Sequence, residues 1–333
     1  MIASIIPEFE FQRCIIDPWA SDASVFGWIF VMGFFVAAAC GLVGNYLILR
    51  RMALMGDAVS HSVLPGLVIA FLLAQSRGTW VMFAGALAAG AATTLIVDAI
   101  HRRSRVKQDS AIGITFSTLF AIGVVLISVY AQQVDLDADC VLYGEIAFVP
   151  LEPFVTIGGV ELGPPSVLRM GSVLLVVIAL VIVFYKELLV SSFDPGLAAS
   201  LGINPSVMHY SLMAMLSIVV VSAFEAVGAI LVIAMLILPG ATAFLLTHRL
   251  WKAMVLSVVH AALSALLGIH LAVWLNCSVA AAMVVMGSVL FALAWIFAPE
   301  GGLIARAVHR RGGHALEEPL IGTPPSEGES VSG

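Results

Sequence analysis

Nine apolar segments, most of them long enough to cross a lipid bilayer, dominate this sequence of 333 residues. A membrane-spanning helix needs about 20 residues to cross about 30 Å of hydrocarbon. Dividing the apolar runs at charges and at Gly, Pro or Asn turns places the segments at roughly 25–49, 52–74, 79–100, 110–131, 167–185, 210–233, 234–248, 253–275 and 277–298. The pattern predicts an all-α polytopic membrane protein, because helices satisfy their own backbone hydrogen bonds in lipid.

The segment at 234–248 is short, so the number of helices is expected to be about nine, within a range of eight to ten. It can be a re-entrant half-helix, or it can form one long bent unit with 210–233. Composition agrees with a membrane protein, since 61% of residues are hydrophobic and 11% are charged, against about 25% charged in soluble domains. A net charge of −6 offers nothing to a nucleic-acid backbone.

Basic residues predict the orientation of the chain, because Lys and Arg accumulate in short cytoplasmic loops. With the N-terminus outside, 12 of the 15 basic residues fall on the cytoplasmic side and 3 fall outside. The three outside are Arg13, Arg77 and Arg169. We therefore expect an N-out, C-in protein of the bacterial plasma membrane. Its predicted parts are an extracytoplasmic arm at 1–24, a membrane domain at 25–299 and a disordered cytoplasmic tail at 300–333.

Three carboxylates lie within the predicted spans, where a charge requires a partner or a function. Asp98 precedes Arg102 by four residues, which predicts an ion pair at the cytoplasmic end of a helix. Asp57 precedes His61 by the same interval, so the two side chains share one helix face and can bind a metal ion. The alternative is an Asp57 paired with Arg50 or Arg51 beside an ordinary hydrogen-bonding histidine.

Glu225 is predicted in the middle of the span at 210–233, with no Lys or Arg nearby on its own helix. A divalent cation shared by Asp57, Glu225 and a neutral His61 would leave the site electrically neutral, as a low-dielectric environment requires. The alternative is a protonated Glu225 bonded to a backbone carbonyl. The four cysteines are scattered without a C-x-x-C pair, so a metal site would use oxygen and nitrogen ligands.

The stretch from Arg51 to Gly66, RMALMGDAVSHSVLPG, resembles the permease subunits of manganese, zinc and iron ABC importers. Further matching stretches follow in the same order, at 141–147, 193–195, 198–203, 225–232 and 238–243. The resemblance covers about residues 25 to 300. It implies an ABC-importer permease fold, a homodimer, a cytoplasmic ATP-binding subunit and an extracytoplasmic metal-binding protein. It also implies that Asp57 and His61 line the metal path.

The cytoplasmic loop at 186–209 is predicted to contain a short helix that docks on the ATPase. Asp194 is a good N-cap, Pro195 fits the first helical position, and Gly202 can end the helix at C′ with a positive φ. The residues expected to form its apolar contact face are Leu197, Ala198 and Leu201. A simple connector is the alternative, although 24 residues is long for one.

The sequence does not predict an enzyme, since it contains neither H-E-x-x-H nor G-x-S-x-G. No Walker A motif is present, so energy must come from a partner chain or from an ion gradient. The runner-up function is therefore a proton-coupled secondary metal-ion carrier. One histidine with several oxygens favours manganese or iron over zinc as the transported ion, and no permanently bound cofactor is expected.

Overall fold

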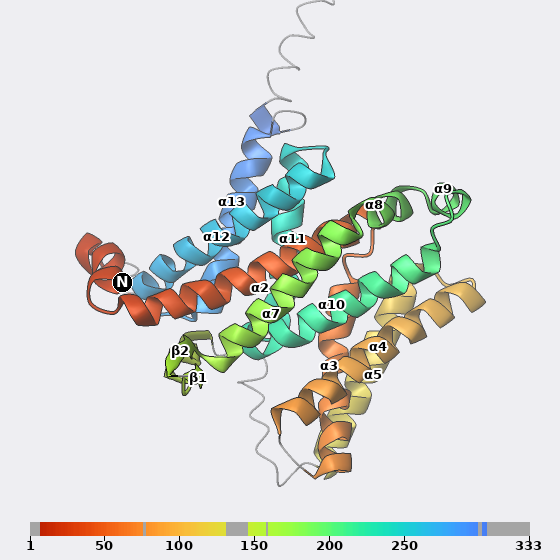
Figure 1. The fold of residues 1–333 in the computed structure, drawn as a ribbon, viewed down its shortest axis with the longest axis horizontal. Helices are drawn as coiled ribbons and strands as arrows, with labels where there is room; N and C mark the ends of the chain where they lie inside the picture. Colours follow the sequence, from red (N-terminus) through yellow and green to blue (C-terminus); the bar gives the residue numbers. More distant parts are fainter. Residues whose placement is uncertain (1–6, 76–77, 131–145, 158, 299–301, 305–333) are drawn as a thin grey trace, which may run out of the picture.

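A computed structural model describes residues 7–75, 78–130, 146–157, 159–298 and 302–304, and shows a bundle of long helices (Figure 1). Eight of its helices are long and apolar enough to span a membrane. They are α2 (Ala23–Leu49), α3 (Met55–Ala74), α4 (Thr79–Arg103), α5 (Gln108–Tyr130), α7 (Pro165–Val183), α10 (Pro205–Val227), α12 (Leu250–Leu275) and α13 (Val279–Phe297). A ninth, α11 (Ala229–Leu246), contains a shorter apolar stretch at Leu231–Leu246. The predicted all-α membrane fold is confirmed.

Shorter elements connect the long helices. On one side are η2 (Gln12–Ile16), α1 (Asp17–Ala20), η3 (Ile146–Leu151) and an antiparallel hairpin of β1 (Val155–Ile157) with β2 (Val160–Gly163), and on the other are α8 (Tyr185–Phe193) and α9 (Pro195–Ser200). In the hairpin Thr156 pairs with Glu161. Neither the hairpin nor α8 was predicted, because both are short and lack an apolar run of their own.

The boundary between the sixth and seventh helices differs from the prediction. The structure ends α10 at Val227 and begins α11 at Ala229, where the sequence predicted a division between 233 and 234. Gly228 separates the helices with φ 78° and ψ 163°, a conformation that favours glycine. Hydropathy misses this break because the apolar run continues through it. The two helices are therefore separate rather than one bent unit, and the boundary between them lies at Gly228 rather than at residue 233.

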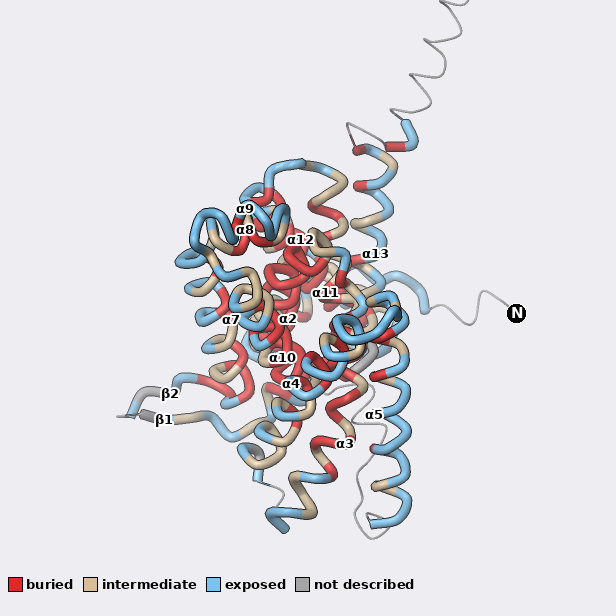
Figure 2. The backbone as a smooth tube through the Cα atoms, turned by 90° about the vertical axis from the view of Figure 1, so that its right-hand side faces the viewer, coloured by how far each residue is buried: buried red, intermediate tan, exposed pale blue. Residues whose placement is uncertain are grey.

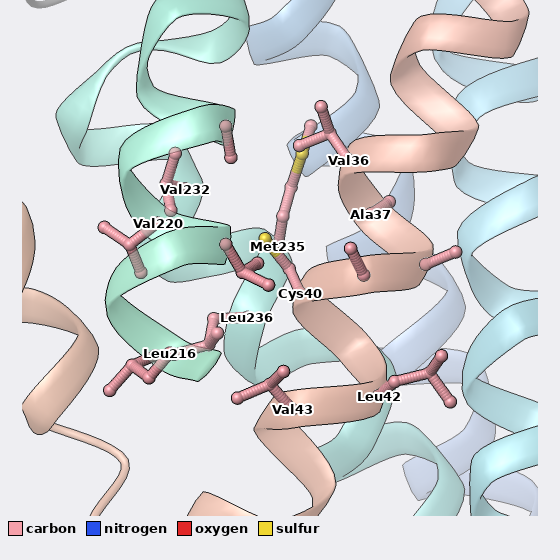
Figure 3. Close-up of a cluster of buried hydrophobic side chains, with 14 of the residues drawn as sticks. Val36, Ala37, Cys40, Leu42, Val43, Leu216, Val220, Val232, Met235 and Leu236 are labelled. Carbon is pink, nitrogen blue, oxygen red and sulfur yellow. The ribbon is translucent and has the colours of Figure 1, made fainter. Parts of the chain in front are cut away.

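Helix α2 forms the centre of the bundle and is buried along most of its length (Figure 2). Its apolar side chains pack against α10 and α11, as Val36, Cys40 and Val43 show in Figure 3. A Cβ atom at Gly44 would lie 1.9 Å from the backbone oxygen of Leu236 in α11. Only glycine therefore permits this close approach of α2 and α11.

A buried polar network also joins three helices at this level. Asn45 Nδ2 donates to Ser257 Oγ at 2.9 Å, and Ser257 Oγ lies 3.1 Å from the carbonyl oxygen of Pro239. Asn45 and Ser257 are fully buried. Helices α2, α12 and α11 are thus fixed relative to one another by a hydrogen-bonded chain as well as by apolar packing.

Contacts between loops follow the predicted sides of the membrane. On the predicted cytoplasmic side, Arg50 after α2 donates to Ser191 and Ser192 of α8. On the predicted outer side, Trp274 Nε1 at the end of α12 donates to the carbonyl oxygen of Pro7 at 3.0 Å, and His270 Nδ1 lies 2.9 Å from that of Cys14. These contacts join segments assigned to the same side, as an alternating N-out, C-in arrangement requires.

The described residues cover only part of the predicted arm and of the predicted tail. Residues 7–22 of the arm include η2, which packs against α12, and α1, which packs against α2 and places Trp19 beside His270 of α12. The predicted tail at 300–333 lies almost wholly outside the residues that the structure describes. The division into an arm, a membrane domain and a tail therefore stays a prediction.

Candidate metal site and coupling loop

Helix α3 brings Asp57 and His61 into contact, as their spacing predicts. His61 Nε2 lies 3.1 Å from Asp57 Oδ1 across one helical turn. The two side chains are 27% and 28% exposed, so both remain accessible to an entering ion. The alternative pairing of Asp57 with Arg50 is not what the structure shows, because the Arg50 guanidinium bonds to α8.

Two aromatic rings of α5 hold the imidazole of His61. The Phe116 ring lies 5.7 Å from the imidazole, centroid to centroid, at an interplanar angle of 31°. The Phe120 ring lies 5.6 Å away and nearly perpendicular, at 80°. Sequence reasoning missed both residues, although two phenylalanines four residues apart share one helix face. Together they restrict the plane in which His61 can present its nitrogens.

Pro65 lies four residues after His61, and α3 continues as a helix through it. Since proline has no N–H, the carbonyl oxygen of His61 lacks its usual helical donor and can act as a further ligand. Helix α5 passes close to this turn, because a Cβ atom at Gly123 would lie 2.9 Å from Pro65 Cδ. The carbonyl, the imidazole and the Asp57 carboxylate thus belong to two adjacent turns of α3.

Glu225 does not lie where the sequence placed it. It stands two residues before the end of α10, next to the Gly228 break, rather than in the middle of a span. Nearby, Val221 of α10 packs with Val63 of α3 in one small cluster. The two helices therefore meet within about one turn of Glu225 on α10 and of His61 on α3. The Glu225 side chain is outside the described part of the structure, and Glu225 as a ligand stays a prediction.

Within the described residues, no group of three or more His, Cys, Asp or Glu side chains could hold a metal ion. The pair formed by Asp57 and His61 is therefore a partial ligand set. An ion held there needs additional oxygens, from a carbonyl, from water or from another carboxylate, since manganese and iron prefer six ligands. A weak, incomplete set suits a site through which an ion passes.

The helix predicted in the cytoplasmic loop is present as α9. Asp194 caps its start, and Asp194 Oδ1 accepts hydrogen bonds from the backbone N–H groups of Gly196 at 2.9 Å and Leu197 at 3.0 Å. Pro195 occupies the first turn. These two assignments of local structure are confirmed, because N-capping depends on a few neighbouring residues.

The end of α9 also has the predicted conformation. Gly202 has φ +81°, and its N–H donates to the Ala199 carbonyl at 3.1 Å, while the N–H of Ile203 donates to the Ala198 carbonyl at 3.0 Å. This pair of bonds is a Schellman motif, which requires a left-handed residue at C′. Asn204 then caps α10 through Oδ1, at 3.0 Å from the Ser206 nitrogen. Helix α9 is therefore joined to α10 by a short, hydrogen-bonded turn.

The contact face predicted on α9 is only partly correct. Leu197 and Leu201 are 50% and 62% exposed, but Ala198 is completely buried within this chain. Residues at i and i+1 point about 100° apart on a helix, whereas i and i+4 share a face. Ala198 thus anchors α9 to the permease, and the two leucines remain available to a partner.

Arg50 is a second link to this loop that sequence reasoning missed. Its Nε donates to Ser192 Oγ and its Nη2 to Ser191 Oγ, each at 2.9 Å. Burial lowers the pKa of the Arg50 guanidinium from its ordinary value, although arginine stays charged at neutral pH. The bond joins residues more than 140 positions apart, and no local signal in the sequence indicates it.

Asp98 makes the structural ion pair that its spacing predicts. Arg102 Nε donates to Asp98 Oδ1 at 2.7 Å, and Tyr210 Oη of α10 donates to Asp98 Oδ2 at 2.5 Å. The carboxylate therefore joins α4 to the first turns of α10, a few residues after α9. Asp98 is occupied by these partners and does not belong to the candidate metal site.

Long apolar helices around a carboxylate–imidazole pair, with a capped helix in the loop before α10, are features of the membrane subunit of a transporter. The chain belongs to the ABC 3 transport family, whose model matches residues 23–298. It is thus a multi-pass bacterial membrane protein and a transport subunit rather than an enzyme.

Curated relatives extend over most of the chain. It is 46% identical over 279 residues to a manganese transport system membrane protein of Bacillus subtilis, and the match covers 84% of this chain and 94% of that protein. It is 42% identical over 276 residues to a zinc transport system membrane protein of Treponema pallidum, covering 83% of this chain and 75% of that protein.

A solved structure shares the fold. PsaBC from Streptococcus pneumoniae, in complex with Fab, superposes with a TM-score of 0.71 at 31% sequence identity. The match covers 93% of this chain and all of the compared chain. The predicted ABC-importer permease fold is therefore confirmed.

Proposed function

We propose that this chain is the membrane permease of an ATP-driven importer of divalent transition-metal ions. Manganese is the favoured ion, with zinc or iron next. The observation that carries the proposal is the contact of Asp57 with His61 on a membrane helix, where both side chains are partly exposed and two aromatic rings pack on the imidazole. A carboxylate and an imidazole within a membrane span are costly unless they have a partner or serve a passing charge.

Manganese is favoured by the chemistry of the ligands as well as by the relatives. An imidazole with carboxylate and carbonyl oxygens suits manganese or ferrous iron, whereas closed zinc sites use more Cys and His. The relative from Bacillus subtilis is named for manganese and the one from Treponema pallidum for zinc. Ion selectivity also depends on the protein that delivers the ion.

The proposed transporter contains two copies of this permease, cytoplasmic ATP-binding subunits and an extracytoplasmic metal-binding protein. Two features of the chain support partners on the cytoplasmic side: the exposed Leu197 and Leu201, and the absence of a Walker A motif. Support for a second copy comes from the accessible Asp57 and His61, because an ion at a protomer surface needs a partner wall to exclude lipid.

The mechanical proposal is that ATP binding moves α9 and that two rigid links carry the movement inward. One link is the short turn from α9 into α10, which packs on α3 beside the candidate site. The other is the bond from α8 to Arg50 at the end of α2. The first link ends at a helix that packs on α3, and the second ends at the helix that α3 follows after a short turn at 50–54, so a tilt of either can change access to Asp57 and His61.

Reconstitution tests the proposed function. The permease, co-purified with a cognate ATPase subunit and placed in liposomes with a cognate binding protein, should import manganese when ATP is supplied. Uptake should persist when a protonophore collapses the proton gradient and should stop with a non-hydrolysable ATP analogue. Uptake driven by a proton gradient without ATP would instead establish a secondary carrier and would contradict the proposal.

A further inference from the structure

An apolar groove runs along the outside of the bundle between α7 and α12. Both helices pack on α2, and Leu42 of α2 forms part of the floor of the groove. The groove has a volume of about 920 Å³ and is lined mainly by aliphatic side chains. Ile182 and Val255 on its walls are 70% and 56% exposed, so no other part of the described chain covers them.

One end of the groove is polar, and it lies on the predicted cytoplasmic side. Lys186, Glu187 and Trp251 line this end, and Lys252 Nζ lies 5.6 Å from the centroid of the Trp251 ring. Tryptophan and lysine mark the level of lipid headgroups in membrane proteins. From Trp251 to Val259 the groove follows nine residues of α12, a rise of about 12 Å along the helix. That length is close to half of a hydrocarbon core of about 30 Å.

The charges at this end are complementary to a particular headgroup. Lys186 and Lys252 with Glu187 carry a net charge of +1. Glu187 Oε2 is buried and has no hydrogen-bond partner among the described residues, so it needs a donor. Phosphatidylglycerol supplies one negative phosphate and neutral hydroxyl donors, which would satisfy both requirements. Phosphatidylethanolamine would pair its ammonium with Glu187 and leave the net positive charge uncompensated.

The groove also faces away from the side of the candidate metal site. His61 contacts rings of α5, and Figure 2 shows α5 and α7 on opposite sides of the bundle. A second copy that completes the metal path beside α3 and α5 would therefore leave the groove open to the membrane. We propose that this groove is a binding site for one phosphatidylglycerol of the cytoplasmic leaflet, with one of its acyl chains along α12 and its headgroup at Lys186 and Glu187.

Native mass spectrometry of the delipidated protein, mixed with equal amounts of phosphatidylglycerol, phosphatidylethanolamine and phosphatidylcholine, tests the proposal. The wild type should retain one phosphatidylglycerol per protomer. Val255→Trp fills the groove and should lose it, whereas Val285→Trp, at a valine 52% exposed on α13, should retain it. Lys186→Gln should lower occupancy roughly fivefold, as expected for one interfacial lysine.

Further results separate this occupant from the others. Glu187→Gln keeps an acceptor oxygen and should preserve phosphatidylglycerol binding, whereas an ethanolamine lipid would be lost. Equal retention of all three lipids, or equal retention by Val255→Trp and Val285→Trp, would overturn the proposal. Dissociation of a wild-type dimer by Val255→Trp alone would also overturn it, because the groove would then be a protomer interface. If Val255→Trp does not fold, Lys186→Gln on the exposed rim decides the question.

Discussion

At the scale of single residues, the candidate site depends on a histidine whose orientation is set by its neighbours. His61 makes one polar contact with Asp57 and two ring contacts with α5. A cation that enters this site replaces the direct 3.1 Å contact between the imidazole and the carboxylate with bonds to itself. The imidazole has to keep its place during this exchange, because a ligand that rotates freely loses entropy on binding. The rings of Phe116 and Phe120 provide that restraint without adding charge.

Phe116→Leu should therefore weaken manganese transport without removing a ligand. Loss of a residue that orients a metal ligand costs roughly tenfold or more in affinity, so the manganese concentration for half-maximal uptake should rise by about that factor. Phe30→Leu is the matched control, since Phe30 stacks on Phe34 of its own helix, away from His61. Equal uptake curves for the two variants would show that the ring does not position His61.

At the scale of elements, glycines decide where helices meet and where they end. Among the described glycines, Gly44 leaves the least room for a side chain, because an added Cβ atom would meet the Leu236 backbone. Gly44→Ala should lower the free energy of unfolding by about 1–3 kcal/mol through overpacking. A methyl group added at Gly27 of the same helix meets no atom within 4 Å, so Gly27→Ala should leave the free energy of unfolding unchanged. Thermal unfolding in detergent measures both, and similar midpoints would contradict the packing of α2 on α11.

Gly202 tests the coupling helix in a different way, because a Cβ atom there meets no neighbour. The cost of a substitution at Gly202 is conformational, because φ is +81° and a β-branched residue is strained there by about 1–2 kcal/mol or more. Gly202→Val should shift the end of α9 and lower ATP-driven uptake while the metal site stays intact. Gly202→Asn, which tolerates the left-handed region, should transport nearly normally. Normal uptake by the valine variant would remove the coupling role from this turn.

The sequence predicted these elements unevenly, for physical reasons that particular residues illustrate. The spans and the turn from Asp194 to Gly202 were predictable because hydropathy and capping depend on nearby residues. The end of α10 was not, since a single glycine broke a continuous apolar run. The bonds from Arg50 to α8, the rings around His61 and the burial of Ala198 depend on tertiary packing. In the candidate site, the Asp57–His61 contact was predictable from spacing alone, whereas the contact of His61 with helix α5 was not.

For the molecule as a whole, contact of α9 with an ATPase requires that the loop carrying α9 lie on the opposite side of the membrane from the turn between α12 and α13. The chain provides a natural reporter, because Cys277 in that turn is exposed, while Cys14 and Cys40 are buried. In a Cys140→Ser background, a membrane-impermeant maleimide should label Cys277 in intact cells. Ser200→Cys, on α9, should be labelled only after permeabilisation. The reverse pattern would invert the orientation and remove α9 from the ATPase side.

We expect transported manganese to pass through the pair formed by Asp57 and His61. The most direct test is ATP-driven manganese uptake into proteoliposomes at limiting metal, with Asp57→Ala and His61→Ala compared with the wild type. Both variants should fold, assemble with the ATPase and lose uptake. His260→Ala, at a histidine whose Nε2 lies 3.1 Å from the Gly287 carbonyl oxygen, should retain it. Wild-type uptake by Asp57→Ala or His61→Ala would contradict the account.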